Sequence, residues 1–439
     1  MIARPPLPPG PYLVVGLARS GVAAALALRA RGEAVTGTDS RAVAREARER
    51  LASAGVVVRD GEAGTESVAG VRAVVKSPGV PREAPVVAAA LAGGLTVMGE
   101  LELGWRLLEH EFVAVTGSNG KTTTVELLGH IHRQAGVPVV VAGNVGTALA
   151  SLPGTLEPGT VIACEASSFQ LEDTLAFAPE AAVLLNLAED HLDRHHTFAN
   201  YRDAKLRVFA NQPPGTLAVV PHMFGEVGGA ATRVTFGPGG DVDERGGRLV
   251  WRGEAFMEVG EIRLPGAHNR ENAMAAAAVS LARGIAAEAV REGLATFAGV
   301  AHRLETVATL NGVAYVNDSK ATNVASASVG IASFPRGVHL IAGGSDKGSD
   351  YSPLVAPVAQ HAVAVYLIGE TAPAMHSALT PSGVPIHETG DLERAVATAH
   401  AAARPGDTVL LSPGCASYDQ YRNYEERGDH FKALVAQLA

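Results

Sequence analysis

Several features that define whole classes of proteins are scarce or missing in this sequence of 439 residues. It contains only two cysteines, Cys164 and Cys415, so a disulfide scaffold or a thiolate metal site is excluded. Acidic residues outnumber basic ones by 45 to 36, which argues against nucleic acid as a partner. No apolar run reaches the roughly 18 residues that a membrane-spanning helix needs, and the proline-rich start lacks the apolar core of a signal peptide. We therefore expect a cytoplasmic protein without membrane insertion.

Lysine is also scarce, because only six of the 36 basic residues are lysine. An ammonium group is a compact charge and a guanidinium group is a planar fork, so the two side chains do different work. Where positive charge alone suffices, this sequence uses arginine. Each remaining lysine is therefore a candidate for a specific role: Lys76, Lys121, Lys205, Lys320, Lys347 and Lys432.

Apolar residues, by contrast, are abundant at 47%, and the length corresponds to about three domains at roughly 150 residues each. Strand-like apolar runs alternate with helix-like segments, which is typical of a parallel, doubly wound sheet. The pattern restarts twice, so we predict an α/β chain of three domains. These are a Rossmann-like domain over residues 1–99, a central P-loop domain with a mostly parallel sheet over 100–300, and a C-terminal Rossmann-like domain over 301–439. The glycine-dense stretch 225–265 is expected to form β-hairpins or an irregular insertion. The expected helices include 22–31, 121–134 and 272–283. The expected strands include 12–15, 34–38, 71–75, 112–116, 161–164, 182–187, 339–342, 364–368 and 408–411.

The strongest local signal is the sequence TGSNGKTT at residues 116–123, between an expected strand and an expected helix. Glycines allow backbone N–H groups to surround phosphate oxygens, and the start of the helix adds a positive field. In such a loop Lys121 reaches the terminal phosphates and Thr122 binds Mg²⁺. The standard pattern has glycine where this chain has Val115. The predicted phosphate-binding residues are Gly117, Ser118, Asn119, Gly120, Lys121, Thr122 and Thr123.

Acidic and imidazole side chains follow the next two expected strands of the central domain. Glu165 ends one strand, and Asp190 and His191 follow the other. Open α/β sheets bind ligands at the carboxyl ends of their strands, and carboxylates beside a phosphate loop are natural ligands of Mg²⁺. His191 and His195 are four residues apart, but no further zinc motif accompanies them, and His195 is expected at the surface.

The first turn of the chain, residues 16–21, resembles a dinucleotide-binding fingerprint in which Ala18 replaces the second glycine. Asp39 lies near the position of a ribose-binding acid. By itself this turn is compatible with a nicotinamide-dependent oxidoreductase or with the binding of another nucleotide.

Taken together and in order, the motifs resemble those of the Mur ligases, the ATP-dependent amide-forming enzymes of peptidoglycan synthesis. The resemblance covers nearly the whole chain, and its shared marks are TGSNGKTT, the Glu165 segment, DHLDRH, GxHNxxN and HRxE. Four further segments resemble the members of the family that add D-glutamate: the first turn with Asp39, SPGVP at 77–81, NDSKATN at 317–323 and the segment 412–428.

The resemblance implies a reaction in three steps. ATP phosphorylates the alanine carboxylate of UDP-N-acetylmuramoyl-L-alanine, the amine of D-glutamate attacks the acyl phosphate, and phosphate leaves. The protein mainly positions anions and neutralises charge, and we expect a monomer whose domains close on binding. Two alternatives remain open at this point: another ligase of the superfamily, such as a folylpolyglutamate synthetase, or a nicotinamide-binding oxidoreductase or sensor.

The resemblance also implies roles for individual residues. Lys121 and Arg303 would hold the terminal phosphates, Thr122 and Glu165 one Mg²⁺, and His191 and Lys205 a second Mg²⁺, with Lys205 carrying a carbamate. Without the resemblance, Lys205 would be interpreted as a solvated helix lysine. The implied ATP contacts also include Asn269, Asn272, Asp318 and Lys320; the UDP contacts are Ala18, Arg19, Asp39, Ser40 and Gly79; the sugar-peptide contacts are Asn144 and Gln170; and the D-glutamate contacts are Thr322, Lys347, Ser417 and Tyr424.

Overall fold

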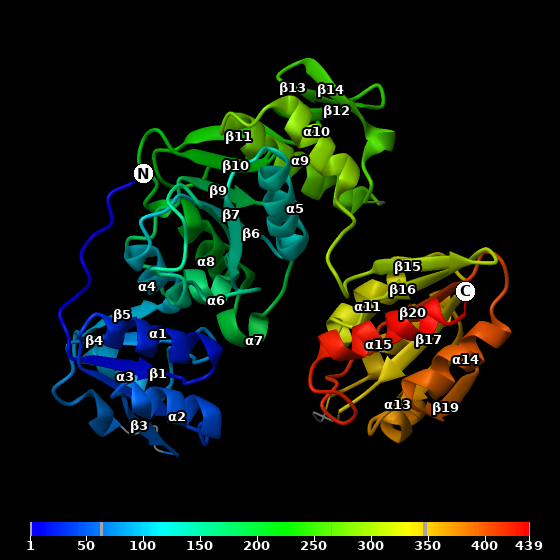
Figure 1. Ribbon diagram of the computed structural model, residues 1–439, viewed down its shortest axis with the longest axis horizontal. Coiled ribbons are helices and arrows are strands. Elements are labelled where there is room, and N and C mark those ends of the chain that lie inside the picture. Colours follow the sequence, from blue (N-terminus) through cyan, green and yellow to red (C-terminus); the bar gives the residue numbers. More distant parts are fainter. Residues whose placement is uncertain (1, 62–64, 265, 346–348, 439) are drawn as a thin grey trace. The chain divides into compact units, whose positions relative to one another are not determined.

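The computed structural model describes residues 2–438 except 62–64, 265 and 346–348 (Figure 1). The chain forms two compact units, residues 1–297 and 298–439. Within the described residues, the first unit contains a five-stranded and a nine-stranded sheet, and the second unit contains a six-stranded sheet. The predicted α/β fold class with mostly parallel sheets is confirmed. The division of the first unit at residue 99 stays a prediction, because both of its sheets belong to one compact unit.

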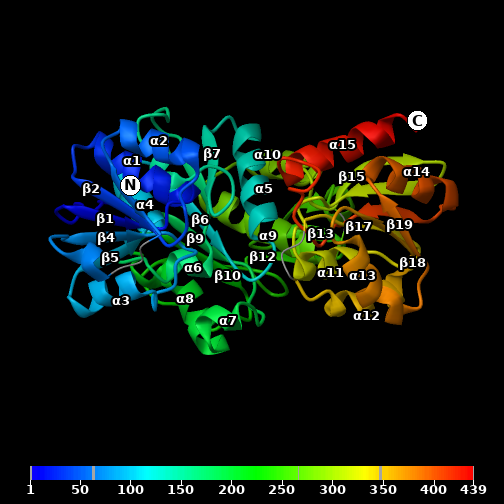
Figure 2. The ribbon, with the colours of Figure 1, turned by 90° about the horizontal axis from the view of Figure 1, so that it is seen from below.

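The first sheet is parallel throughout and has the strand order β3-β2-β1-β4-β5. Its central strands β1 (Tyr12–Val15) and β4 (Ala73–Lys76) are buried along their whole length, as expected for strands that are covered on both faces. Figure 2 shows α1 and α2 on one face of this sheet and α3 on the other. The remaining elements are β2 (Val35–Asp39), β3 (Val57–Asp60), β5 (Thr96–Gly99), α1 (Arg19–Ala30), α2 (Arg45–Ser53), α3 (Pro85–Ala92) and α4 (Glu100–Leu107).

The second sheet has the order β14-β13-β12-β11-β10-β9-β6-β8-β7. It is parallel from β7 to β12, and β12, β13 and β14 form antiparallel hairpins, which confirms the hairpins expected from the glycine-dense stretch. Its strands are β6 (Phe112–Thr116), β7 (Val139–Gly143), β8 (Val161–Glu165), β9 (Ala181–Leu184), β10 (Leu217–Pro221), β11 (Thr232–Phe236), β12 (Val242–Arg245), β13 (Arg248–Trp251) and β14 (Glu254–Glu258). Its helices are α5 (Lys121–Gln134), α6 (Ser168–Leu171), α7 (Leu192–His195), α8 (Phe198–Ala210), α9 (Ala267–Ala282) and α10 (Ala287–Thr296).

One helix boundary in this sheet differs from the prediction. Helix α9 begins at Ala267, whereas the sequence predicted that this helix begins at Asn272. Gly266 precedes the helix with φ of 97°, a conformation that glycine adopts without strain. The polar side chains that suggested a loop therefore lie on the first two turns of the helix.

The third sheet forms the second unit and has the order β15-β16-β20-β17-β18-β19. All its neighbouring strands are parallel except the β15 and β16 pair. Its strands are β15 (Glu305–Leu310), β16 (Val313–Asn317), β17 (Val338–Gly343), β18 (Ala362–Ile368), β19 (Ile386–Gly390) and β20 (Thr408–Leu411). Its helices are α11 (Val324–Ala332), α12 (Val355–His361), α13 (Ala372–Leu379), α14 (Leu392–Ala402) and α15 (Tyr424–Ala436).

The strand order brings three loops of the second sheet to one edge. Strand β6 lies between β8 and β9, and these three strands are parallel. The residues that follow their carboxyl ends therefore meet at the same edge, which is where open α/β sheets bind ligands. Among the described residues, no helix is long and apolar enough to cross a membrane.

Candidate active site

The loop between β6 and α5 has the backbone shape of a phosphate cradle. Gly120 adopts φ of 83°, and a Cβ atom at this position would lie 2.2 Å from Oδ1 of Asn272. The Ser118 hydroxyl anchors the loop through contacts with the Ala188 carbonyl at 3.0 Å and the Tyr201 hydroxyl at 2.9 Å. Lys121 donates hydrogen bonds of 2.9 Å to the carbonyls of residues 117 and 118. The sequence-predicted loop residues are thus brought together, and Asn272 is adjacent to them.

Glu165 lies beside this loop with both carboxylate oxygens in use. Thr122 Oγ1 donates to Oε2 at 2.8 Å, and Asn144 Nδ2 donates to Oε1 at 2.8 Å. The carboxylate is almost fully buried. A hydroxyl and a carboxylate next to a phosphate loop are the oxygen donors that Mg²⁺ takes, together with substrate phosphates. These residues therefore fit a magnesium ion, although the described residues contain no cluster of three or more metal-binding side chains.

Lys205 points at the same loop from helix α8. Its side chain is 1% exposed, its Nζ atom donates to the Gly117 carbonyl at 2.7 Å, and it lies 4.6 Å from the centre of the Tyr201 ring. Burial and the nearby positive charge of Lys121 lower the pKa of Lys205 to about 7. The interpretation of Lys205 as a solvated lysine, which its helical surroundings favoured, is therefore wrong.

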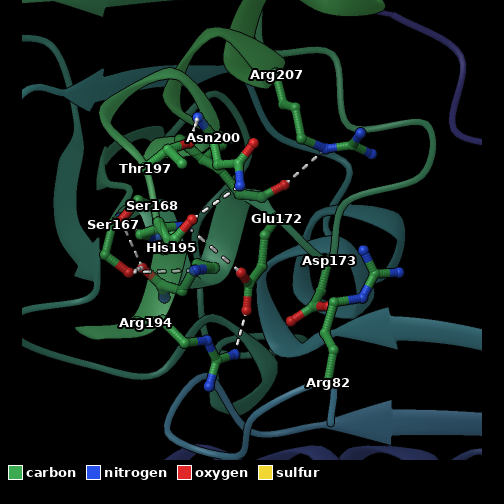
Figure 3. A network of polar contacts seen from close by, with 12 residues as sticks. Arg82, Ser167, Ser168, Glu172, Asp173, Arg194, His195, Thr197, Asn200 and Arg207 are labelled. Atoms are coloured by element: carbon green, nitrogen blue, oxygen red, sulfur yellow. Dashed lines mark hydrogen bonds and ion pairs between the residues drawn. The ribbon is translucent and has the colours of Figure 1, made fainter. Parts of the chain in front are cut away.

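His191 lies at the start of α7, about half exposed, with Nε2 3.4 Å from a carboxylate oxygen of Asp190. Its ring centre is 4.8 Å from that of Phe169. The expectation of a surface position for His195 is wrong, because His195 is 6% exposed and its Nε2 lies 3.0 Å from the Ser168 hydroxyl (Figure 3). The left-handed backbone of His191, with φ of 52°, starts the short helix that turns His195 inward.

The predicted UDP contacts lie at the carboxyl ends of the strands of the first sheet. Ala18 and Arg19 follow β1, Ser40 follows β2, and Gly79 follows β4. Asp39 accepts hydrogen bonds from the backbone N–H groups of Leu17 at 2.7 Å and Arg41 at 3.0 Å, so it also fixes the shape of the turn.

Two predicted residues connect this turn with the second sheet. Arg19 donates to the Asn144 carbonyl at 3.4 Å, so the first turn reaches the residue that holds Glu165.

Gln170 is buried and closes a capping box at the start of α6, where its Oε1 accepts from the Ser167 N–H at 3.0 Å. Its amide is therefore occupied in placing α6 directly after Glu165. Asn269 and Asn272 lie one turn apart on α9, with Asn272 Nδ2 3.4 Å from Asn269 Oδ1.

In the second unit, the segment 317–323 contains a buried acid. Asp318 accepts from the Ser412 hydroxyl at 2.8 Å and from the Leu304 N–H at 3.2 Å, and burial raises its pKa to about 6. Asp318 is thereby linked to the residue next to Arg303 and to the start of the segment 412–428. Lys320 donates its N–H to the His302 carbonyl at 2.9 Å, and Thr322 follows it in the same turn. The prediction for Lys347 falls outside the described residues.

Sequence reasoning missed Arg427, which organises the predicted D-glutamate residues. Its guanidinium is 1% exposed and donates to the Ser319 hydroxyl at 3.0 Å and to the carbonyls of Cys415 at 3.2 Å and Ala416 at 3.3 Å. Ser319 in turn donates to the Tyr424 carbonyl at 2.8 Å, and Ser417 follows Ala416. Burial lowers the pKa of Arg427 to about 10. The signal available in the sequence was an arginine at a core-facing position of α15.

The fold and the phosphate loop define a nucleotide-binding α/β protein, and comparison with known families gives its class. Residues 11–99 match the model of the Mur ligase MurD-like N-terminal domain, residues 115–280 the Mur ligase middle domain, and residues 302–415 the Mur ligase glutamate ligase domain. The chain belongs to the Mur ligase family. The alternative of a nicotinamide-dependent oxidoreductase is thereby set aside.

Relatives within this family narrow the class further. The chain is 42% identical to the UDP-N-acetylmuramoylalanine--D-glutamate ligase of Acidobacterium capsulatum, with 96% of this chain and 95% of the relative covered. It is 43% identical to the enzyme of the same name from Geotalea uraniireducens, with 97% of each chain covered. The fold is similar to that of the MurF ligase from Thermotoga maritima, solved in complex with ADP, with a TM-score of 0.58, 16% identity, and 92% and 96% of the two chains covered.

Proposed function

We propose that this chain joins D-glutamate to UDP-N-acetylmuramoyl-L-alanine at the expense of ATP, in the synthesis of peptidoglycan precursors. The observation that carries the proposal is the similarity over almost the whole chain to relatives that bear this name. The glutamate ligase domain over residues 302–415 and the MurD-like N-terminal domain over 11–99 support it independently.

The chemistry requires activation, because a carboxylate is a poor electrophile. An oxygen of the alanine carboxylate attacks the γ-phosphorus of ATP, and ADP leaves. The amine nitrogen of D-glutamate then attacks the acyl carbon, the amine loses a proton, and inorganic phosphate leaves with the C–O bond electrons. An amide bond is formed, and the chain serves mainly to orient the reactants and neutralise their charge.

In this scheme the loop 117–123 and Lys121 hold the phosphates of ATP, and Arg303 contacts the γ-phosphate. Mg²⁺ held by Thr122 and Glu165 supplies positive charge to the phosphate oxygens. The hydrogen bond of 2.8 Å between Thr122 and Glu165 supports this assignment, since it places both oxygen donors together at the start of α5.

Lys205 is proposed to carry a carbamate that holds a second Mg²⁺ with His191. A neutral amine can attack the carbon of CO₂, form an N–C bond and release a proton, whereas an ammonium cannot. The buried position of Lys205 and its pKa of about 7 support this step, because a large fraction of the amine is then neutral near pH 7. Arginine does not readily form this adduct, which agrees with the presence of lysine here.

The remaining residues divide by substrate and by domain. Residues 1–99 bind the UDP group, 100–300 bind ATP and the sugar-peptide part, and 301–439 bind D-glutamate and contribute Arg303, Asp318 and Lys320 to the ATP site. All proposed contacts come from one chain, so a monomer is sufficient. The UDP contacts are Ala18, Arg19, Asp39, Ser40 and Gly79; the sugar-peptide contacts are Asn144 and Gln170; the further ATP contacts are Asn269, Asn272, Asp318 and Lys320; and the D-glutamate contacts are Thr322, Lys347, Ser417 and Tyr424.

A phosphate-release assay tests the proposal. The purified chain is given ATP, Mg²⁺ and UDP-N-acetylmuramoyl-L-alanine with D-glutamate, L-glutamate, L-alanine or a diamino acid, and a parallel series replaces the UDP substrate with a reduced folate. Release with D-glutamate and the UDP substrate, and its loss in Glu165→Gln, is the expected result. Background release with D-glutamate, or faster release with the folate and L-glutamate, would overturn the proposal.

A further inference from the structure

Lys76 is a completely buried lysine that none of the proposed substrate or metal roles uses. It ends strand β4 and is 0% exposed. Its Nζ atom lies 2.6 Å from Oδ2 of Asp173 and 3.7 Å from Oε1 of Glu172, and it donates to the Val80 carbonyl at 2.7 Å. A buried lysine with two carboxylates requires accurate geometry, because Coulombic attraction must offset the loss of hydration.

The partners of Lys76 belong to a group of charges that joins the two sheets of the first unit. We call this group the intersheet cluster; its members are Lys76, Arg82, Glu172, Asp173 and Arg194. Lys76 and Arg82 flank the turn after β4 of the first sheet, and the other three members flank α6 or lie in α7 of the second sheet. Figure 3 shows Arg82 and Arg194 approaching Asp173 and Glu172 from different segments.

A backbone contact accompanies the cluster. The Gly99 N–H donates to the Asp173 carbonyl at 2.9 Å. The Val80 carbonyl accepts from Lys76 and also from Arg194 Nη2 at 3.1 Å. The second sheet therefore contacts the turn after β4 through the Arg194 side chain, and it contacts the end of β5 through a main-chain hydrogen bond.

On the side of the first sheet, the residue that follows Lys76 in the chain contacts the proposed UDP turn. Ser77, next to Lys76, donates to the Gly16 carbonyl at 2.7 Å, and its hydroxyl lies 3.3 Å from that of Ser20. A shift of Lys76 and Ser77 relative to the second sheet would therefore carry residues 16–20 along with it, because Ser77 contacts both ends of this turn.

On the side of the second sheet, the cluster supports the short helix that follows His191. Arg194 of this helix bonds to Glu172, and His195 Nδ1 lies 3.9 Å from Glu172. The Phe169 ring packs against both histidines, with its centre 4.8 Å from that of His191 and 5.5 Å from that of His195. The placement of His191 thus depends on groups that the cluster holds.

We propose that Lys76 is a positioning residue, whose ion pair with Asp173 sets the alignment of the UDP turn with the His191 loop. The inference rests on the proposed function, in which one substrate binds with its UDP group at the first sheet and its carboxylate at the second. A fixed alignment keeps that carboxylate at the phosphate loop, and a misplacement of about 1 Å can cost on the order of 100-fold in rate. Loss of Lys76 should therefore lower kcat while leaving the binding of UDP alone unchanged.

Spin labels on the two sheets measure the alignment directly in the full chain. Val57 in β3 and Met223 after β10 are 56% and 87% exposed, and Cys164 and Cys415 are buried, so Val57→Cys and Met223→Cys provide selective labelling sites. We expect one narrow distance distribution in the parent and a broader or displaced one in Lys76→Met. We also expect kcat to fall at least tenfold and the Kd for UDP to stay within threefold.

A matched control separates alignment from stability. Arg283→Met removes a partly buried ion pair, Arg283 to Glu111 at 2.5 Å, that lies within the second-sheet part of the chain. It should lower Tm without changing the distance distribution or kcat. An unchanged distribution and kcat in Lys76→Met would overturn the proposal.

The double variant Lys76→Met with Asp173→Leu keeps the proposal testable if the single variant does not fold. Removing both charges of a buried pair often restores stability, so Tm should recover while the broad distribution and low kcat persist. Recovery of the narrow distribution and of kcat with Tm would show a merely structural role and overturn the proposal. The distance measurement needs no turnover, so failure of the proposed function would be recognised separately.

Discussion

Two buried lysines in the first unit have different electrostatic surroundings. Lys76, between the two sheets, lies 2.6 Å from a carboxylate oxygen of Asp173 and has Glu172 as a second acidic neighbour. Lys205, at the phosphate loop, donates to a neutral carbonyl, lies against the Tyr201 ring and has the positive charge of Lys121 nearby. Both side chains are almost completely buried.

The difference shows that a buried lysine can either form a structural ion pair or present an amine for chemical modification. A buried ammonium paired with carboxylates makes a rigid contact, since breaking the pair leaves an uncompensated charge. A buried ammonium beside another cation loses its proton more easily, and here the pKa of Lys205 is lowered to about 7. Lys76 is therefore suited to holding structure and Lys205 to chemical modification.

The largest expected effect is that of Lys205→Ala. Removing the proposed carbamate removes a metal ligand, so we expect kcat to fall roughly a thousandfold, which corresponds to several kcal/mol of lost charge stabilisation. Phosphate release measures the loss. A short carboxylic acid such as acetate should restore part of the activity, and equal restoration by chloride would contradict the carbamate.

Lys76→Met should mainly change stability and alignment. Breaking a buried ion pair by removing one partner costs about 3–5 kcal/mol of unfolding free energy, and urea unfolding followed by circular dichroism measures it. Asp173→Leu in the same chain should recover most of this loss. A loss below about 1 kcal/mol in the single variant would show that Lys76 contributes no more than a surface pair.

The pH dependence of activation by bicarbonate should distinguish the two lysines. Only the neutral amine reacts with CO₂. When the bicarbonate is adjusted so that dissolved CO₂ is the same at each pH, the rate at which CO₂-depleted protein regains activity should fall about tenfold per pH unit below about 7 and level off above it. Lys76→Met should keep this profile, and Lys205→Ala should show no recovery. A rate that keeps rising tenfold per unit up to pH 10 would contradict the lowered pKa of Lys205.

The smallest effect is expected for Lys432→Met. This lysine is about one third exposed and lies 2.9 Å from Asp429, and such exposed pairs contribute about 0–1 kcal/mol. Tm should shift little, and kcat should stay within twofold. A larger change in kcat would show that the second unit depends on this pair.

Local patterns were sufficient for much of the fold. The expected strands 12–15, 112–116 and 408–411 and the helix 121–134 agree with the structure residue for residue. Their boundaries depend on apolar runs and on turn-forming residues within a few positions, so the neighbouring sequence contains the information. The start of α9 was misplaced because polar residues in the first turns of a helix resemble a loop.

By itself, the sequence determined the α/β class, the phosphate loop at 116–123 and the family, because each depends on residue types at short or ordered spacings. Only the tertiary structure decided that Lys205 and His195 are buried. It likewise decided that Arg427 links Ser319 to residues 415 and 416, and that Lys76 pairs with Asp173. The pair Lys76 and Asp173 is almost one hundred residues apart in the chain. Burial and charge pairing over such separations arise from the packing of sheets against one another, which no local pattern specifies.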